Sequence, residues 1–272
     1  MRTRVLSAIV ALAIVVPVLA WGGPRGVWWL MFPLVLVGMD EYARMALPGL
    51  SRPAWAAYVL AGGGVTALAV HAPAWLGACL PVAVMACLVV PMFAEADTVR
   101  ATERAMRLLF GLVYLPLLAA PLALIRQVAW DGRDVGLPLL ALLMVATFGG
   151  DTGGYFAGRA FGKTPLFPRV SPKKTVEGLV GGIVLAVVGV GVVNHLAGLG
   201  FSLVEVVVLG VLLDLAGVLG DLAESLLKRA FGVKDSGWIM PGHGGVLDRV
   251  DSLLFSAPAL WLALQLRATF AG

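Results

Sequence analysis

The chain has 272 residues, of which 60% are hydrophobic and only 13% are charged, and its formal net charge is +4. An average soluble domain is about 25% charged, and polar residues must cover its exterior. This composition therefore excludes a soluble globular protein and indicates a chain that exposes apolar side chains to lipid. It also argues against nucleic-acid binding, because the basic residues form no stripe interleaved with aromatic side chains.

Apolar runs predict nine helices, each near the length of about 20 residues that a membrane span requires. We therefore expect an all-α, polytopic integral membrane protein with about nine transmembrane helices. Glycines around Asp151 are expected to break the end of the sixth helix. The predicted spans are Arg4–Ala20, Val27–Ala46, Pro53–His71, Ala74–Pro91, Met106–Gln127, Leu137–Phe156, Val176–His195, Leu203–Leu222 and Ser252–Thr269.

The basic residues are distributed unevenly over the predicted connections. With a cytoplasmic N-terminus, sixteen of the 20 lysines and arginines lie on the cytoplasmic side and four lie outside, as the positive-inside rule requires. The first span has a second interpretation as a cleaved signal peptide, because Arg2 and Arg4 precede its apolar run. The run is long for a signal core, so we favour a retained span and a cytoplasmic N-terminus.

The predicted spans divide the chain into two regions. Residues 1–135 hold five spans, and residues 136–272 hold four spans and two long cytoplasmic connections, 158–175 and 228–251, rich in Gly, Pro, Lys and Asp. Long polar loops in a compact protein are usually functional, so we expect the catalytic region in the C-terminal half. Cys79 and Cys87 lie in one apolar stretch and form neither a disulfide framework nor a metal-ligand pattern.

The eighth span carries charged residues at membrane depth. Asp214, Asp221, Ser225 and Lys228 have spacings that place them on one helix face. A carboxylate there costs about 2.5–3.5 kcal/mol on the lenient insertion scales, so it persists where it meets a cation, a partner or water. A purely structural ion pair of Asp221 with a neighbouring basic residue is the alternative, and the role of Asp214 stays open.

The connection before the ninth span has a glycine-rich turn around His243, Gly244 and Gly245. Such a turn before a helix N-terminus exposes N–H groups that suit an anion. Asp248 and Asp251 follow, three residues apart and on one face of the first helical turn. Pairing with the helix dipole is the simpler reading, but it accounts for one aspartate better than for two.

Lysines complete the set of polar groups. Lys173 and Lys174 follow Ser-Pro at the start of the seventh span, where they suit a polyphosphate, although interfacial anchors also use lysines. The carboxylates favour Mg²⁺, which prefers few protein oxygens together with substrate phosphates. Carboxylates and lysines on one membrane face therefore indicate phosphoryl or nucleotidyl transfer.

The run from Ser225 to Asp251, S-L-L-K-R-x4-K-D-x-G-x3-P-x-H-G-G-x2-D-R-x-D, resembles the signature of the phosphatidate cytidylyltransferases, or CDP-diacylglycerol synthases. The segments 151–158 and 171–178 are also similar to that family, so the resemblance covers the C-terminal half. Met240 and Gly154 depart from the usual family residues. Neither position carries a chemical group that the reaction needs.

The resemblance implies that CTP and phosphatidate react to CDP-diacylglycerol and pyrophosphate in phospholipid biosynthesis, with Mg²⁺, at the cytoplasmic face of a cell membrane. It also implies a homodimer, and a second, monovalent cation is left open. Fifteen arginines against five lysines suggest a bacterial source. The expected catalytic residues are Asp221, Asp248, Lys173, Lys174 and Asp151, and the expected metal ligands are Asp221, Asp248 and Asp251. The expected substrate contacts are Ser225, Lys228, Arg229, Lys234, Asp235, His243, Gly244, Gly245 and Arg249.

Two other functions use similar residues. An enzyme acting on another lipid phosphate, such as a polyprenol or an ether-linked lipid, needs the same groups, because these groups address phosphates rather than tails. A transporter also uses broken helices and intramembrane carboxylates, usually near the midplane and between inverted repeats. Here the polar groups gather at one face and the sequence shows no repeat, which favours an enzyme.

Overall fold

The computed structural model describes residues 17–18, 21–238 and 244–271, and within these ranges it contains eight α-helices and two short β-hairpins. The first four helices are α2 (Gly23–Ala46), α3 (Arg52–His71), α4 (Pro73–Ala94) and α5 (Thr98–Arg126). The next four are α6 (Gly136–Phe161), α7 (Val176–Ala197), α8 (Leu203–Ala230) and α9 (Leu247–Ala271). One hairpin joins β1 (Ala129–Trp130) to β2 (Arg133–Asp134), and the other joins β3 (Pro165–Phe167) to β4 (Ser171–Thr175).

The second to ninth predicted spans each correspond to one of these helices. Seven of the described helices, α3 to α9, are long and apolar enough to cross a membrane. The prediction of a multi-pass, mainly helical membrane protein is therefore confirmed, with two small hairpins added. The first predicted span lies almost wholly outside the described residues, so the count of nine and the orientation stay predictions.

The outer surface of the helices matches a lipid environment. On α4, Val82, Met85 and Phe93 are exposed, and on α7 Val180 and Val188 are exposed. In water these side chains would form large apolar patches, which soluble monomers avoid. Lipid removes that cost, because its tails are as apolar as the side chains.

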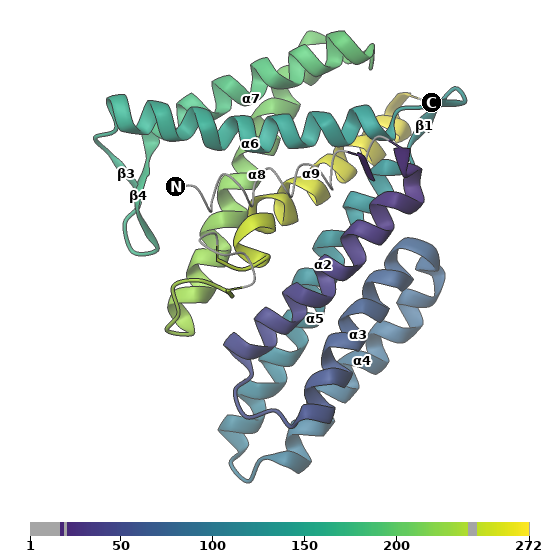
Figure 1. Cartoon of the computed structure of the whole chain (residues 1–272), viewed down its shortest axis with the longest axis vertical. Helices are drawn as coiled ribbons and strands as arrows, with labels where there is room; N and C mark the ends of the chain where they lie inside the picture. The colour runs from purple at the N-terminus through teal and green to yellow at the C-terminus, as the bar shows by residue number, and fades with distance from the viewer. Residues whose placement is uncertain (1–16, 19–20, 239–243, 272) are drawn as a thin grey trace.

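The helices form two groups that α9 joins. Figure 1 shows α2 to α5 running alongside one another, with α6 and α7 paired across one end and α8 and α9 between the groups. In the first group α5 packs against α2, α3 and α4, and α9 contacts both α5 and α8. Accordingly Leu254 of α9 belongs to one buried cluster and Leu260 to the other.

The end of α6 corrects the sequence prediction. The helix continues through the glycines around Asp151 and ends at Phe161, five residues beyond the predicted Phe156. The glycines allow close packing on α7 instead, since a Cβ at Gly153 would lie 2.6 Å from the carbonyl oxygen of Gly181. Small residues serve this purpose in membrane helices, where packing drives association.

The connection from α6 to α7 is also more ordered than a loop. Residues 165–175 form the β3–β4 hairpin, and Lys173 and Lys174 lie on β4. Glu177, in the first turn of α7, accepts hydrogen bonds from the backbone N–H groups of Lys163 at 3.1 Å and Thr164 at 3.2 Å. The Thr175 hydroxyl caps α7 by accepting from the N–H of Gly178. These bonds hold the two lysines in place beside α7.

Candidate active site

Three carboxylates meet where α8 faces the start of α9. One oxygen each of Asp221, Glu224 and Asp251 lies within 4.8 Å of the other two. Asp221 and Glu224 are three residues apart and so share a face of α8. The Glu224 side chain is 2% exposed, and among the described residues its Oε1 atom has no hydrogen-bond partner. A buried, unpartnered carboxylate oxygen is costly unless a cation or proton meets it.

Asp248 has different surroundings, although it lies one helical turn before Asp251. Its Oδ1 atom pairs with the Lys228 ammonium at 2.5 Å. Its Oδ2 atom accepts hydrogen bonds from the Ser236 N–H and hydroxyl, both at 2.9 Å, and from the Gly245 N–H at 2.8 Å. Asp248 thus lies outside the three-carboxylate group, and its oxygens are already satisfied by the protein.

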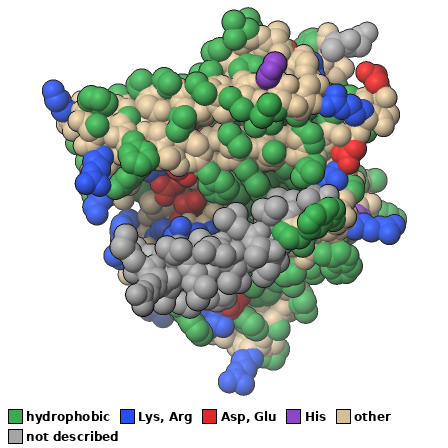
Figure 2. All heavy atoms as spheres, turned by 45° about the horizontal axis from the view of Figure 1, so that its top comes forward, with side chains coloured by type: hydrophobic (Ala, Val, Ile, Leu, Met, Phe, Trp, Pro, Cys, Tyr) green, Lys and Arg blue, Asp and Glu red, His purple; other side chains and the backbone are tan. Residues whose placement is uncertain are grey.

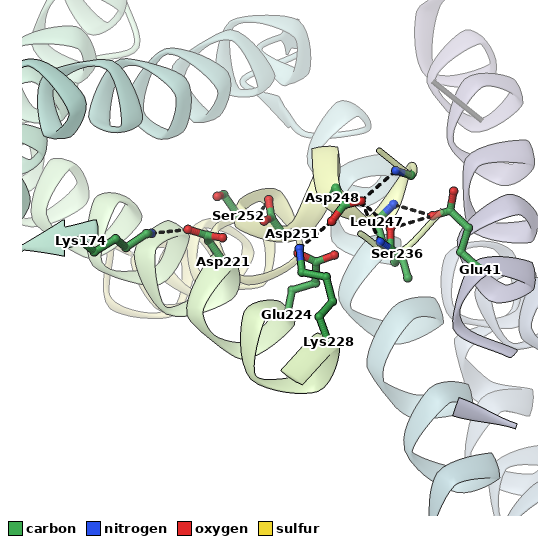
Figure 3. Close-up of polar contacts among 11 residues, drawn as sticks. Glu41, Lys174, Asp221, Glu224, Lys228, Ser236, Leu247, Asp248, Asp251 and Ser252 are labelled. Carbon is green, nitrogen blue, oxygen red and sulfur yellow. Dashed lines mark hydrogen bonds and ion pairs between the residues drawn. The ribbon is translucent and has the colours of Figure 1, made fainter. Parts of the chain in front are cut away.

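The clustered carboxylates share their lysine partners. The residues labelled in Figure 3 include five carboxylates and only two lysines. Lys228 lies between Glu224 at 2.7 Å and Asp248 at 2.5 Å, and Lys174 pairs with Asp221 at 2.5 Å. Because a carboxylate at membrane depth is expensive unless a cation or proton meets it, the oxygen of Glu224 that has no partner among the described residues suits a further cation. Hard oxygen ligands and an unpartnered carboxylate oxygen suit Mg²⁺.

A cavity of about 390 Å³ adjoins these carboxylates. It lies between α6, β4, α7 and α8, and its charged lining residues are Asp151, Arg159, Lys173, Lys174 and Asp214. Figure 2 shows acidic and basic side chains in a hollow beneath the apolar surface of the α6–α7 layer. The Lys174–Asp221 ion pair connects the cavity to the three-carboxylate group. A polyanion in the cavity would therefore contact basic groups and lie beside the carboxylates.

Asp214 is buried in the cavity wall. The residue is 3% exposed, and among the described residues its Oδ2 atom has no hydrogen-bond partner. Gly150 and Gly182 make room for it, since a Cβ at Gly150 would collide with its carboxylate and one at Gly182 would lie 2.9 Å from Oδ1. Asp214 and Asp151 thus line one cavity, although the sequence left the role of Asp214 open.

Comparisons with known proteins identify the family of the chain. The model of the cytidylyltransferase family matches residues 2–267. The chain belongs to this family. The predicted family, whose members are nucleotidyltransferases, is confirmed.

Relatives named phosphatidate cytidylyltransferase cover different shares of the chain. The one from Staphylococcus epidermidis (strain ATCC 35984) is 33% identical over 269 residues, 97% of this chain and 99% of its own length. The one from Haemophilus influenzae is 36% identical over 196 residues, 70% of this chain and 66% of its own length. The one from Bacillus subtilis is 46% identical over 131 residues, about half of each protein at 48% and 49%.

The other predicted substrate contacts of this cytidylyltransferase-family chain lie around the same helix ends. Ser225 is half-buried on α8, and Arg229, Lys234, Asp235 and Arg249 are exposed. Arg249 has a contact within the protein. His243 lies outside the described residues.

The predicted anion cradle differs from what the described part of the turn contains. Gly244 has a left-handed φ of 80°, as glycine allows. The N–H of Gly245 donates to Asp248, and those of Val246 and Leu247 donate to Glu41. The carboxylates of Asp248 and Glu41 therefore accept the hydrogen bonds of the N–H groups from Gly245 to Leu247. Glu41 belongs to α2, which is distant in the chain.

Two acidic residues near the site were not predicted to act there. Glu224 lies two residues beyond the predicted end of the eighth span, on the part of α8 that continues to Ala230, and Glu41 lies within α2, in the half of the chain that carried no motif. The signal that could have found both is an acidic residue within an apolar span or directly after it.

Proposed function

We propose that the protein is a Mg²⁺-dependent phosphatidate cytidylyltransferase acting at the cytoplasmic face of a cell membrane. A phosphate oxygen of phosphatidate attacks the α-phosphorus of CTP, the bond from that phosphorus to the bridging oxygen of the β-phosphate breaks, and pyrophosphate leaves. CDP-diacylglycerol remains in the bilayer. The observation that carries the proposal is the Lys174–Asp221 pair, which joins a cavity lined by basic groups to three clustered carboxylates.

The reaction needs charge compensation more than proton transfer. The attacking phosphate is already ionised, so a strong general base has nothing to remove. The protein must hold two anions in line and neutralise the charge that develops on the leaving pyrophosphate. Lys173, Lys174 and Arg159 line the cavity and can contact phosphate oxygens there. Asp151 and Asp214 lie among them and can orient the lysine ammonium groups.

Asp221, Glu224 and Asp251 are the residues proposed to hold Mg²⁺. The unpartnered Oε1 atom of Glu224 and the excess of carboxylates support this ligand set. When bound, Mg²⁺ supplies positive charge next to the phosphates and a template for their orientation. Asp248, which the sequence placed among the ligands, is proposed instead to hold Lys228 against Glu224.

Phosphatidate can reach the site from the bilayer. Phe156 and Phe161 of α6 are exposed near the β3–β4 end, and Leu219 and Leu226 are exposed on α8. The lipid tails would lie along these apolar faces while the phosphate meets the lysines. The positive-inside distribution supports a cytoplasmic location of this end, and the homodimer stays a prediction.

The test is release of pyrophosphate by the full chain purified in detergent. Labelled CTP and phosphatidate would be supplied with Mg²⁺ or with a chelator, and the lipid product would be resolved. Label in CDP-diacylglycerol that requires all three components is the expected result. A folded protein that forms no labelled lipid with phosphatidate, but does so with a polyprenol phosphate or an ether-linked lipid phosphate, would reassign the acceptor. A folded protein inactive with every acceptor would reject nucleotidyl transfer.

A further inference from the structure

Glu41 is a buried carboxylate outside the region that carries the family motif. It lies in α2, it is 2% exposed, and an apolar run ends just before it and its neighbour Asp40. An ionised carboxylate in such surroundings requires strong partners. Its oxygens lie 2.8 Å from the N–H of Val246 and 2.9 Å from the N–H of Leu247, about 205 residues further along the chain. The Glu41 carboxylate therefore accepts hydrogen bonds from backbone N–H groups at the start of α9.

The contact solves a problem of helix geometry. The first N–H groups of a helix have no partners within it, and a negative charge there also interacts favourably with the helix dipole. The start of α9 obtains this charge from another helix. Two glycines leave just enough room for the Glu41 carboxylate. A Cβ at Gly245 would lie 2.5 Å from Glu41 Oε2, and one at Gly237 would collide with the same carboxylate.

A chain of contacts runs from Glu41 to the three-carboxylate group. The Ser236 hydroxyl lies 3.3 Å from Glu41 and 2.9 Å from Asp248. Its single proton goes to the nearer Asp248, so the bonded route from Glu41 to Asp248 runs through the first turn of α9 rather than through Ser236. Asp248 holds Lys228 at 2.5 Å, and Lys228 holds Glu224 at 2.7 Å. Figure 3 shows these side chains following one another from α2 to α8.

We propose that Glu41 is a positioning residue: it fixes the first turn of α9, which carries Asp248, and through Asp248 sets the orientation of Lys228 and Glu224. The N-terminal helices are then part of the site, because one of them supplies the carboxylate on which the orientation of the metal-binding group depends. This inference rests on the proposed function for its activity readout. Its metal-binding readout does not require that any particular lipid is the substrate.

The test compares Glu41→Gln with Asp40→Asn in the purified full chain. Both changes remove one negative charge from the same turn of α2, but Asp40 pairs with Arg44 at 2.7 Å rather than with α9. Binding of Mn²⁺, used as a probe for Mg²⁺, would be measured by electron paramagnetic resonance without substrates. Pyrophosphate release would be measured against the Mg²⁺ concentration.

Glu41→Gln is expected to weaken Mn²⁺ binding by about 10- to 100-fold, the range found when groups that orient metal ligands are removed. The half-saturating Mg²⁺ concentration should rise in parallel, and excess Mg²⁺ should restore part of the rate. Glu41→Asp, which keeps the charge on a shorter side chain, should weaken Mn²⁺ binding less than Glu41→Gln does. Asp40→Asn should behave as the unmodified chain.

Unchanged Mn²⁺ binding in folded Glu41→Gln would overturn the inference and leave Glu41 as a helix cap only. Where Glu41→Gln does not fold, Glu41→Asp takes its place, because it keeps the negative charge but draws the carboxylate back from the N–H groups of α9. Weaker Mn²⁺ binding in folded Glu41→Asp supports the inference, and unchanged binding rejects it. Absent pyrophosphate release in the unmodified chain would reject the proposed function, while the Mn²⁺ comparison would still decide on Glu41.

Discussion

The surroundings of Asp248 and of Asp251 differ sharply, although the two residues lie one turn apart at the start of α9. Asp248 is held by Lys228 and by three donors from Ser236 and Gly245. Asp251 accepts one hydrogen bond, from the N–H of Ser252, and lies with Asp221 and Glu224 in a group in which an oxygen of Glu224 has no partner among the described residues. The difference teaches that a satisfied carboxylate supports the architecture, whereas an unsatisfied group is available for a cation. Four predictions test it, from the largest effect to the smallest.

Asp251→Asn should abolish turnover and leave the fold intact. We expect pyrophosphate release to fall by more than about 100-fold, the upper range for groups that only orient metal ligands. The apparent melting temperature in detergent should stay the same or rise, because one of three neighbouring carboxylates is neutralised. Near-normal release in this variant would remove Asp251 from the proposed ligand set.

Asp248→Asn should lower the stability of the protein, which Asp251→Asn does not. Removing one member of a buried ion pair costs about 3–5 kcal/mol, and we expect the lower end because Lys228 keeps its contact with Glu224. Thermal unfolding in detergent measures this loss. The distinction between Asp248 and Asp251 would be wrong if Asp248→Asn were as stable as the unmodified chain and Asp251→Asn were less stable.

Lys174→Gln should weaken the use of CTP. A hydrogen bond to a charged group contributes about 1.5–3 kcal/mol, so kcat/KM for CTP should fall by roughly 10- to 150-fold. Steady-state kinetics at saturating Mg²⁺ measure the effect. Lys163→Gln is the matched control, since Lys163 lies in the same connection but does not line the cavity. An equal loss of kcat/KM in both variants would mean that the positive charge of the connection matters, and not the place of Lys174 in the cavity.

Two adjacent glycines of α6 sharpen the distinction at the cavity wall. Gly150→Ala would drive a methyl group into the Asp214 carboxylate, whereas Gly149→Ala meets nothing within 4 Å. Overpacking costs about 1–3 kcal/mol, while alanine replaces glycine in an open helical position with a gain of about 0.5–1 kcal/mol. The melting temperature should therefore fall for the first variant and hold or rise for the second. Equal values would mean that Asp214 moves freely.

The sequence by itself determined the long apolar helices and the family of the chain. Hydropathy suffices for the helices, because lipid requires long apolar segments whose backbone groups are satisfied within the helix. The motif from Ser225 to Asp251 identified the family, since its residues are close together in the chain. The glycines near Asp151 were misread as a helix break, because a local rule does not include the neighbouring helix that small residues allow to approach.

Only the tertiary structure decided which partners each carboxylate has. Asp248 and Asp251 look alike in the sequence, and their roles separate through contacts with Lys228, Ser236 and Asp221 from other segments. Glu41 lies about 205 residues along the chain from the N–H groups that donate hydrogen bonds to it, so no spacing rule could pair them. The physical reason is that hydrogen bonding and charge compensation depend on distance in space, and in a folded chain that distance is set by packing.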